Sequence, residues 1–147
     1  MNSQATEKKY KAIFFDWDGT AVVTRSAPVD RILPLMIELA RNGTILVVIS
    51  GTTYEKIAGG KFHEYIPTDA AGNIFLGLGR GAFNYGFDKN GALSILHSAL
   101  PQKDDLLKIH DISFAIHQML LREYGLPTDI VFSRPNYCKI DLMVTYD

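Results

Sequence analysis

The first half of the chain contains short apolar runs that lack the alternation of a half-exposed strand. The run at 12–15 (AIFF) and the run at 44–49 (TILVVI) each end abruptly in polar residues, and a weaker run covers 66–70. A continuous apolar run of this length is typical of a strand buried on both faces, as in a parallel sheet. The pattern therefore predicts two buried strands and a third, weaker one.

Helical patterns separate these strands. The segment 28–41 carries apolar residues at helical spacing, and Asn42-Gly43 follows it as a stop signal. A second helix is predicted over 53–58, closed by Gly59-Gly60. Strands that alternate with helices imply right-handed crossovers and a parallel sheet. The first half therefore predicts an α/β fold with a partial Rossmann-like core.

The pattern changes from about Gly72, where a glycine-rich passage begins. Beyond it, 83–87 and 92–97 are predicted strands joined by Asn90-Gly91, a strong hairpin signal. A long helix is predicted over 101–124, then strands at 129–133 and 139–145. This order predicts a small, partial α+β unit after the core. The predicted division is a disordered leader (1–10), the core (11–76), a hinge linker (77–82) and the α+β unit (83–147).

Polar residues directly follow the first two predicted strands, at the end of a parallel sheet where ligands bind. The sequence Asp16-Trp17-Asp18-Gly19-Thr20 follows the first, and Ser50-Gly51-Thr52 follows the second. Two nearby carboxylates need a cation or divided protonation roles, and Mg²⁺ prefers oxygen ligands. One carboxylate can attack phosphorus while the other donates a proton. The alternatives are an acidic turn formed by chance and a helix N-cap at Ser50.

These two motifs resemble motifs one and two of the haloacid dehalogenase superfamily. The resemblance implies a phosphatase or a phosphomutase, because members that act on phosphate esters carry the second aspartate. It implies that Asp16 is the nucleophile that forms an aspartyl-phosphate and that Asp18 is the general acid/base. It further implies Mg²⁺ bound by Asp16 and by the Asp18 carbonyl, and phosphate binding by Ser50, with Gly51 and Thr20 in support.

The predicted α+β unit resembles the large C2-type cap of that superfamily, found in phosphomannomutases, sugar-phosphate phosphatases and Cof-type phosphatases. The superfamily places a catalytic lysine and an acidic metal-binding cluster after the cap, and the 147 residues show a candidate for neither. We therefore expect an amino-terminal portion of such an enzyme, inactive in isolation. Its first strand would be an unpaired sheet edge, to be covered by another copy or a complementing chain.

Composition limits the classes of partner. The formal net charge is −1, which predicts no general attraction to nucleic acid or to an anionic membrane. No apolar run approaches the ~20 residues that a membrane-spanning helix requires. The polar start is no secretory signal, and the single cysteine, Cys138, cannot form an intrachain disulfide. These features favour the cytoplasm.

The expected function is Mg²⁺-dependent hydrolysis of a small phosphorylated metabolite, with a sugar phosphate favoured. A phosphomutase and a non-catalytic binding or assembly module remain alternatives. The stretch from Gly77 to Gly81 does not fit a nucleotide-binding GxGxxG, so it is interpreted as the hinge. Arg80 within it could reach a substrate phosphate, but a solvated linker charge is the favoured interpretation. His110 and His117 are interpreted as surface or interface histidines.

Overall fold

The computed structural model describes residues 10–24 and 27–143, so nearly all of the predicted leader lies outside the described residues. The chain forms two compact units, Met1–Ser98 and Ala99–Asp147. The division therefore falls after Ser98 and not at the predicted hinge, 77–82. The structure contains no helix, among the residues it describes, that is long and apolar enough to cross a membrane.

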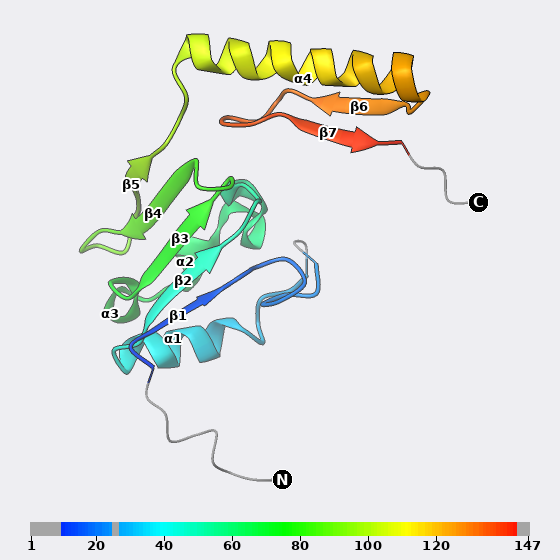
Figure 1. Ribbon diagram of the computed structural model, residues 1–147. Helices are drawn as coiled ribbons and strands as arrows, with labels where there is room; N and C mark the ends of the chain where they lie inside the picture. The colour runs from blue at the N-terminus through cyan, green and yellow to red at the C-terminus, as the bar shows by residue number, and fades with distance from the viewer. Residues whose placement is uncertain (1–9, 25–26, 144–147) are drawn as a thin grey trace. The chain divides into compact units, whose positions relative to one another are not determined.

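The first unit is built on a five-stranded sheet in the order β1-β2-β3-β4-β5 (Figure 1). The strands are β1 (Ala12–Phe15), β2 (Ile45–Ile49), β3 (Ile74–Leu78), β4 (Phe83–Phe87) and β5 (Leu93–Ser98). The first three are parallel, and β4 and β5 are antiparallel to their neighbours. This mixed sheet confirms the predicted α/β class with a partial Rossmann-like core.

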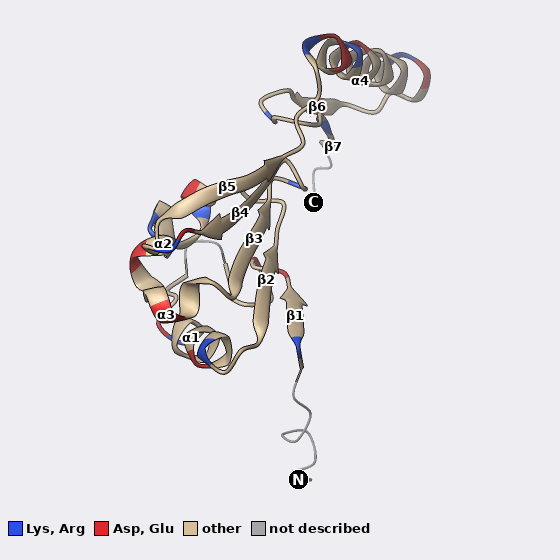
Figure 2. Ribbon diagram, turned by 90° about the vertical axis from the view of Figure 1, so that its left-hand side faces the viewer, with Lys and Arg blue, Asp and Glu red and all other residues tan. Residues whose placement is uncertain are grey.

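Helices cover one face of this sheet, as the side view shows (Figure 2). They are α1 (Leu33–Arg41), the 3-10 turns η2 (Tyr54–Lys56) and η3 (Ala58–Gly60), α2 (Phe62–Tyr65) and α3 (Thr68–Ala71). On the covered face, side chains such as Leu46, Val48 and Leu76 are almost fully buried. Burial of this apolar area is the main favourable term that holds the layers together.

The opposite face of the sheet carries apolar side chains that α1, α2 and α3 do not cover. Phe14, Val47 and Phe75 lie in register on β1, β2 and β3. Phe14 is 65% exposed and Ile49 is 52% exposed. The prediction of strands buried on both faces is therefore wrong for the described residues, because their helices pack on one side only.

Several predicted elements begin or end elsewhere. The helix predicted over 28–41 begins at Leu33, with Pro34 in its first turn, where proline is tolerated. The helix predicted over 53–58 is only a 3-10 turn, and Gly59, at φ 65°, breaks the helical conformation after it. The strand predicted over 66–70 is wrong, since Pro67 precedes the short helix α3. The third strand is instead β3, within the glycine-rich passage.

The predicted hairpin 83–87/92–97 is confirmed as β4 and β5, but it belongs to the core sheet. Leu78 at the end of β3 pairs with Phe83 at the start of β4, so the turn between them is short. The stretch predicted as a hinge is therefore the end of β3 and a tight turn. Direct strand pairing across that turn joins β4 to the first unit.

The second unit combines one long helix with a two-stranded antiparallel sheet. The helix α4 (Lys103–Tyr124) is followed by β6 (Thr128–Val131) and β7 (Lys139–Leu142). Gly125, at φ 64°, ends α4 in the left-handed conformation predicted for a helix stop. The end of the strand predicted over 139–145 lies outside the described residues. The helix and hairpin confirm an α+β arrangement for this unit.

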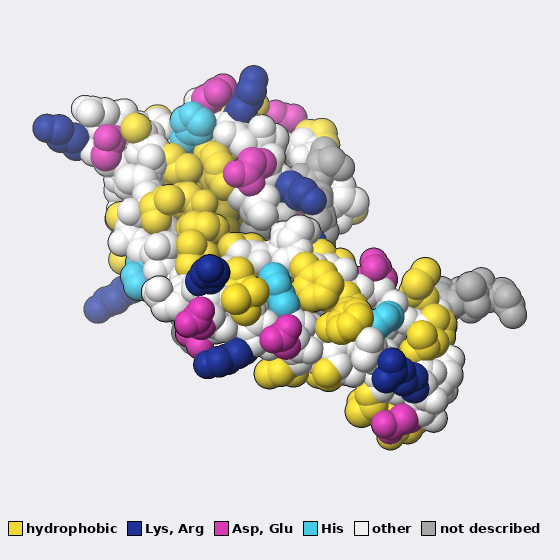
Figure 3. All heavy atoms as spheres, turned by 90° about the horizontal axis from the view of Figure 1, so that it is seen from above, with side chains coloured by type: hydrophobic (Ala, Val, Ile, Leu, Met, Phe, Trp, Pro, Cys, Tyr) yellow, Lys and Arg dark blue, Asp and Glu magenta, His cyan; other side chains and the backbone are white. Residues whose placement is uncertain are grey.

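One face of α4 packs toward its own sheet. Ser113 is buried on this face, whereas Ile116 is 38% exposed. His117 Nδ1 lies 2.6 Å from the Thr128 hydroxyl, so this histidine contacts the sheet of its own unit. Hydrophobic side chains also reach the surface among charged residues and histidines (Figure 3).

Candidate active site

The segment after β1 places its two aspartates on either side of a buried anchor. Asp16 directly follows β1 and is exposed, whereas Asp18 is half-buried. Trp17 between them is fully buried, and its ring meets Phe62 of α2 edge-on at 5.7 Å. Edge-to-face contact between aromatic rings adds to the burial energy. Trp17 therefore fixes the position of the backbone that carries both carboxylates.

A tight turn follows the aspartates and depends on Gly19. Gly19 has φ 78°, and its N–H donates to the Val22 carbonyl at 2.8 Å. The Ala21 N–H donates to the Asp16 carbonyl at 3.3 Å, so the chain folds back on the end of β1. A positive φ is costly for residues with a Cβ, which explains the glycine. Thr20 lies exposed in this turn.

The second motif forms a compact loop at the end of β2. Ser50 is buried, with 5% exposure, and its Oγ accepts a hydrogen bond from the Thr52 N–H at 3.3 Å. The Ser50 N–H donates to the Gly77 carbonyl of β3 at 2.9 Å. Gly51, between them, is exposed. The loop is thus held to β3, with the backbone of Gly51 open to solvent.

Strand register brings the two motifs to the same edge of the sheet. Phe15 pairs with Val48 on the neighbouring strand. Asp16 is therefore level with the residue that precedes Ser50. Neighbouring strands lie about 4.8 Å apart. Asp16 and Ser50 therefore lie at adjacent carboxyl ends of parallel strands, as the sequence predicts, and Asp18 and Thr20 follow in the turn.

The structure adds contacts for Thr52, which belongs to the predicted Ser50-Gly51-Thr52 motif, and for Arg80. The Thr52 hydroxyl is buried and makes no hydrogen bond with another described residue. A buried polar group of that kind is uncommon and often marks a functional site. The Thr52 carbonyl accepts a hydrogen bond from the Gly79 N–H at 2.8 Å, which brings the turn with Arg80 against the Ser50 loop. Only the tertiary fold reveals this contact.

The aspartate pair offers the oxygen donors that magnesium prefers. The described residues contain no group of three or more histidine, cysteine, aspartate or glutamate side chains that could hold a metal ion. Mg²⁺ is commonly bound through one or two carboxylates together with substrate phosphate and water. Asp16 and Asp18 fit that small donor set, and they do not fit the nitrogen and sulfur sites of zinc.

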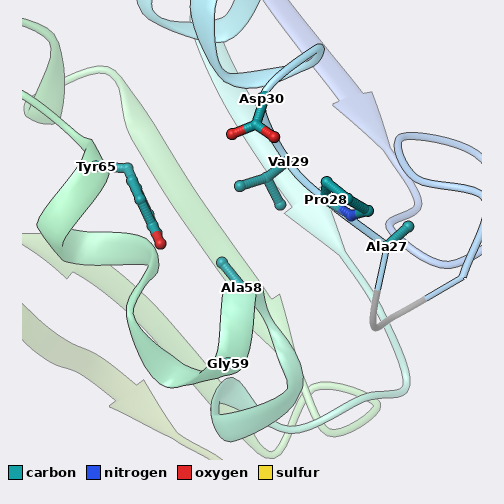
Figure 4. Close-up of a pocket in the computed structure, with 7 residues that line it drawn as sticks. All are labelled: Ala27, Pro28, Val29, Asp30, Ala58, Gly59 and Tyr65. Atoms are coloured by element: carbon teal, nitrogen blue, oxygen red, sulfur yellow. The ribbon is translucent and has the colours of Figure 1, made fainter.

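A hollow elsewhere in the first unit does not coincide with these residues. It has a volume of about 200 Å³ and is lined by backbone and small side chains together with the Asp30 carboxylate and the Tyr65 ring (Figure 4). None of Asp16, Asp18 and Ser50 lines it. This hollow is therefore a separate feature from the predicted phosphoryl-transfer site.

Two tyrosines fasten the segment that follows the Ser50 loop. The Tyr54 hydroxyl lies 2.7 Å from His63 Nδ1, and its ring packs on Tyr85 of β4 with centroids 5.6 Å apart. Burial raises the pKa of Tyr54 above its usual value, although the hydrogen bond from the His63 N–H opposes this. Burial, with a smaller contribution from Glu55, also raises the pKa of Tyr85. These contacts tie η2 to the sheet.

Comparison with known proteins finds similarity at the level of structure. No protein-family profile and no curated protein matches the sequence. Solved structures of IMP-nucleotidase from Plasmodium falciparum share the fold. The IMP-bound mutant has a TM-score of 0.66 at 12% identity, covering 93% of this chain and 42% of that chain. An N-terminally truncated form has a TM-score of 0.61 at 14% identity, covering 93% and 43%.

These similarities show a shared fold and no more. The chain spans about two fifths of the length of the nucleotidase structures it matches. The shared fold agrees with the α/β fold that the two motifs imply. The C2-type cap subgroup stays a prediction.

Proposed function

We propose that this chain carries the nucleophile side of a Mg²⁺-dependent phosphatase site that acts on a small phosphorylated metabolite. The observation that carries the proposal is the pair Asp16 and Asp18 at the carboxyl end of β1, beside the Ser50 loop at the end of β2. Exposed Asp16 is accessible to a phosphate ester. Half-buried Asp18 lies two residues on, within the same turn.

In the proposed reaction, an Asp16 carboxylate oxygen attacks phosphorus, and the bond to the ester oxygen breaks. Asp18 gives a proton to the departing oxygen and so releases the alcohol. Asp18 then takes a proton from a water molecule that attacks the aspartyl-phosphate, which frees inorganic phosphate and restores Asp16. The Ser50 hydroxyl and loop N–H groups stabilise the phosphoryl oxygens. Mg²⁺ bound by Asp16 and the Asp18 carbonyl would offset phosphate charge.

A sugar phosphate is the favoured substrate class because of the resemblance of the second unit to a sugar-phosphatase cap. The structural similarity to an IMP-nucleotidase adds a nucleoside monophosphate as a second candidate. A phosphomutase would return the phosphoryl group to a sugar instead of water. Inorganic phosphate release measured against isomerised product separates these reactions.

The proposal also places the catalytic lysine and the remaining acidic ligands outside these 147 residues, supplied by further sequence or by another chain. Turnover is therefore measured on the complete protein, with a panel of sugar phosphates and IMP, in the presence and absence of Mg²⁺. Asp16→Asn removes the attacking oxygen and is expected to lower kcat at least about 10³-fold. Asp30→Asn, at the separate hollow, is the matched control and should keep wild-type turnover. Retained Mg²⁺-dependent turnover in Asp16→Asn contradicts the assignment.

A further inference from the structure

The turn between β3 and β4 holds an arginine in an unusual backbone conformation. Gly79, Arg80 and Gly81 have φ values of 61°, 57° and 86°. Glycine adopts such values freely, but a residue with a Cβ does so at a cost. Strain of this kind persists where the surrounding structure enforces it, and it is concentrated at functional sites. The surrounding structure therefore holds the Arg80 backbone in this conformation at an energetic cost.

The strained turn is fastened to the loop that is proposed to bind phosphate. The Gly79 N–H donates to the Thr52 carbonyl at 2.8 Å, and the Ser50 N–H donates to the Gly77 carbonyl at 2.9 Å. A longer contact of 3.5 Å joins the Arg80 N–H to the Ser50 carbonyl. These contacts set the position of Arg80 relative to Ser50, so Arg80 is no freely moving linker residue.

The Arg80 side chain lies against Gly51. A Cβ atom built on Gly51 would be 3.6 Å from Arg80 Cγ and 3.7 Å from Arg80 Nε, which is ordinary van der Waals contact. The exposed Gly51 backbone and the start of the guanidinium group are therefore neighbours. A guanidinium presents a planar fork of N–H donors that matches phosphate oxygens and stays charged at every physiological pH.

No long helix begins directly after the Ser50 loop in the described part of the chain. A helix was predicted directly after Ser50, and its dipole would have favoured an anion. The structure has only the three-residue 3-10 turn η2 there, which is too short to carry a substantial macrodipole. A fixed arginine supplies the positive charge that such a loop needs.

We propose that Arg80 is an anion-binding residue of this site. Its guanidinium donates hydrogen bonds to the non-bridging oxygens of a phosphate group seated at the Ser50–Gly51 loop. The inference rests on the proposed function in one respect: the anion is the phosphoryl group of a phosphate monoester. Arg80 is exposed, as a solvated charge would be, but it lies in a tight turn of the first unit and not in a linker between domains.

The test compares phosphate affinity with thermal stability in the 147-residue chain. Inorganic phosphate is titrated in the presence of Mg²⁺, by NMR, into the wild type and into Arg80→Gly and Arg80→Lys. Because glycine accepts the left-handed backbone, Arg80→Gly should keep or raise Tm while it weakens phosphate binding about tenfold, as expected for loss of a charged hydrogen bond. Arg80→Lys should bind with intermediate affinity. Lys89→Gln, the same loss of charge in the β4–β5 turn, should bind as the wild type does.

Ser50→Ala separates this inference from the proposed function. Wild-type affinity in Arg80→Gly, with weakened binding in Ser50→Ala, would overturn the role of Arg80 and leave the site standing. Weakened binding in Arg80→Gly with no effect of Ser50→Ala or of Mg²⁺ would keep Arg80 as an anion-binding residue and contradict the phosphatase site. If phosphate binds to none of these proteins, both the role of Arg80 and the proposed phosphatase site are overturned.

Discussion

At the scale of single residues, the motif DWDGT combines two reactive carboxylates with a structural anchor. The sequence predicts the carboxylates, because paired aspartates after an apolar run have few structural uses. It does not predict that Trp17 packs on Phe62, since the two are distant in sequence and only the fold brings them together. Trp17 and Phe62 are both fully buried, so the chemistry depends on an aromatic contact that local patterns do not show.

This anchor makes a first prediction. Phe62→Ala should lower the free energy of unfolding by about 3–5 kcal/mol, because it removes a fully buried ring and leaves a cavity beside Trp17. Urea denaturation followed by the fluorescence of Trp17, the single tryptophan, measures the change directly. Phe14→Ala is the matched control: Phe14 is 65% exposed, and its loss should cost less than about 1 kcal/mol. Equal losses in both variants would contradict the anchoring role.

At the scale of elements, strand and helix patterns predict some segments well and others badly. The positions of β1 and β2, the β4–β5 hairpin and the end of α4 at Gly125 were predictable, since each has a strong local signal. The segment 66–70 was mistaken for a strand because a short apolar run has no decisive period. The third strand, β3, lies among glycines, which have a low preference for strands. Its pairing with β2 stabilises the strand despite that low preference.

The Ser50 loop shows the same limit at the candidate site. Its residues, Thr52 included, were predicted, but its contact with Arg80 was not, because that contact joins the end of β2 to the β3–β4 turn. Sequence reasoning treated that turn as a hinge between domains. A site assembled from the ends of adjacent strands needs the strand order, which local patterns do not supply.

The element η2 gives a prediction of pH dependence. Burial raises the pKa of Tyr54 and of Tyr85 above the value of an unfolded tyrosine, about 10. A raised pKa in the folded state means that this stability is present below pH ~10 and is lost as the pH rises through the folded-state values. The urea midpoint of the wild type should therefore fall above pH ~10.

Tyr54→Phe should reduce that alkaline loss, although it lowers overall stability by breaking the contact with His63. Tyr65→Phe, at a tyrosine that is 47% exposed, serves as the control and should keep the wild-type dependence on pH. Urea midpoints measured between pH 8 and 11 give the slope of stability against pH for each variant. An unchanged slope in Tyr54→Phe would exclude Tyr54 as a source of the alkaline loss.

At the scale of the whole molecule, the first unit carries a sheet with an apolar open face and β1 at its edge. An edge strand presents backbone hydrogen-bonding groups that favour pairing with another chain. The net charge of −1 opposes association only weakly. The sequence predicted this edge from the resemblance to a larger core sheet, and the strand order agrees with it.

We therefore predict that the 147-residue chain self-associates as its concentration rises. Phe14→Lys places a charge on the edge strand and on the open face, and it should shift the population toward monomer. Val23→Lys is the control, because Val23 is 87% exposed and lies outside the sheet. Sedimentation velocity over a hundredfold concentration range measures the distribution. A wild type that stays a single monomeric species throughout would contradict the prediction.

The most direct test of the central claim is an amide NMR titration of the 147-residue chain with inorganic phosphate and Mg²⁺. We predict the largest shifts at the backbone amides of 16–20 and 50–52, since these two loops are proposed to hold the metal and the phosphate together. Asp16→Asn should abolish the Mg²⁺-dependent part of the response. Shifts centred on the hollow of Asp30 and Tyr65, or a response in Asp16→Asn identical to that of the wild type, would contradict the phosphoryl-transfer site.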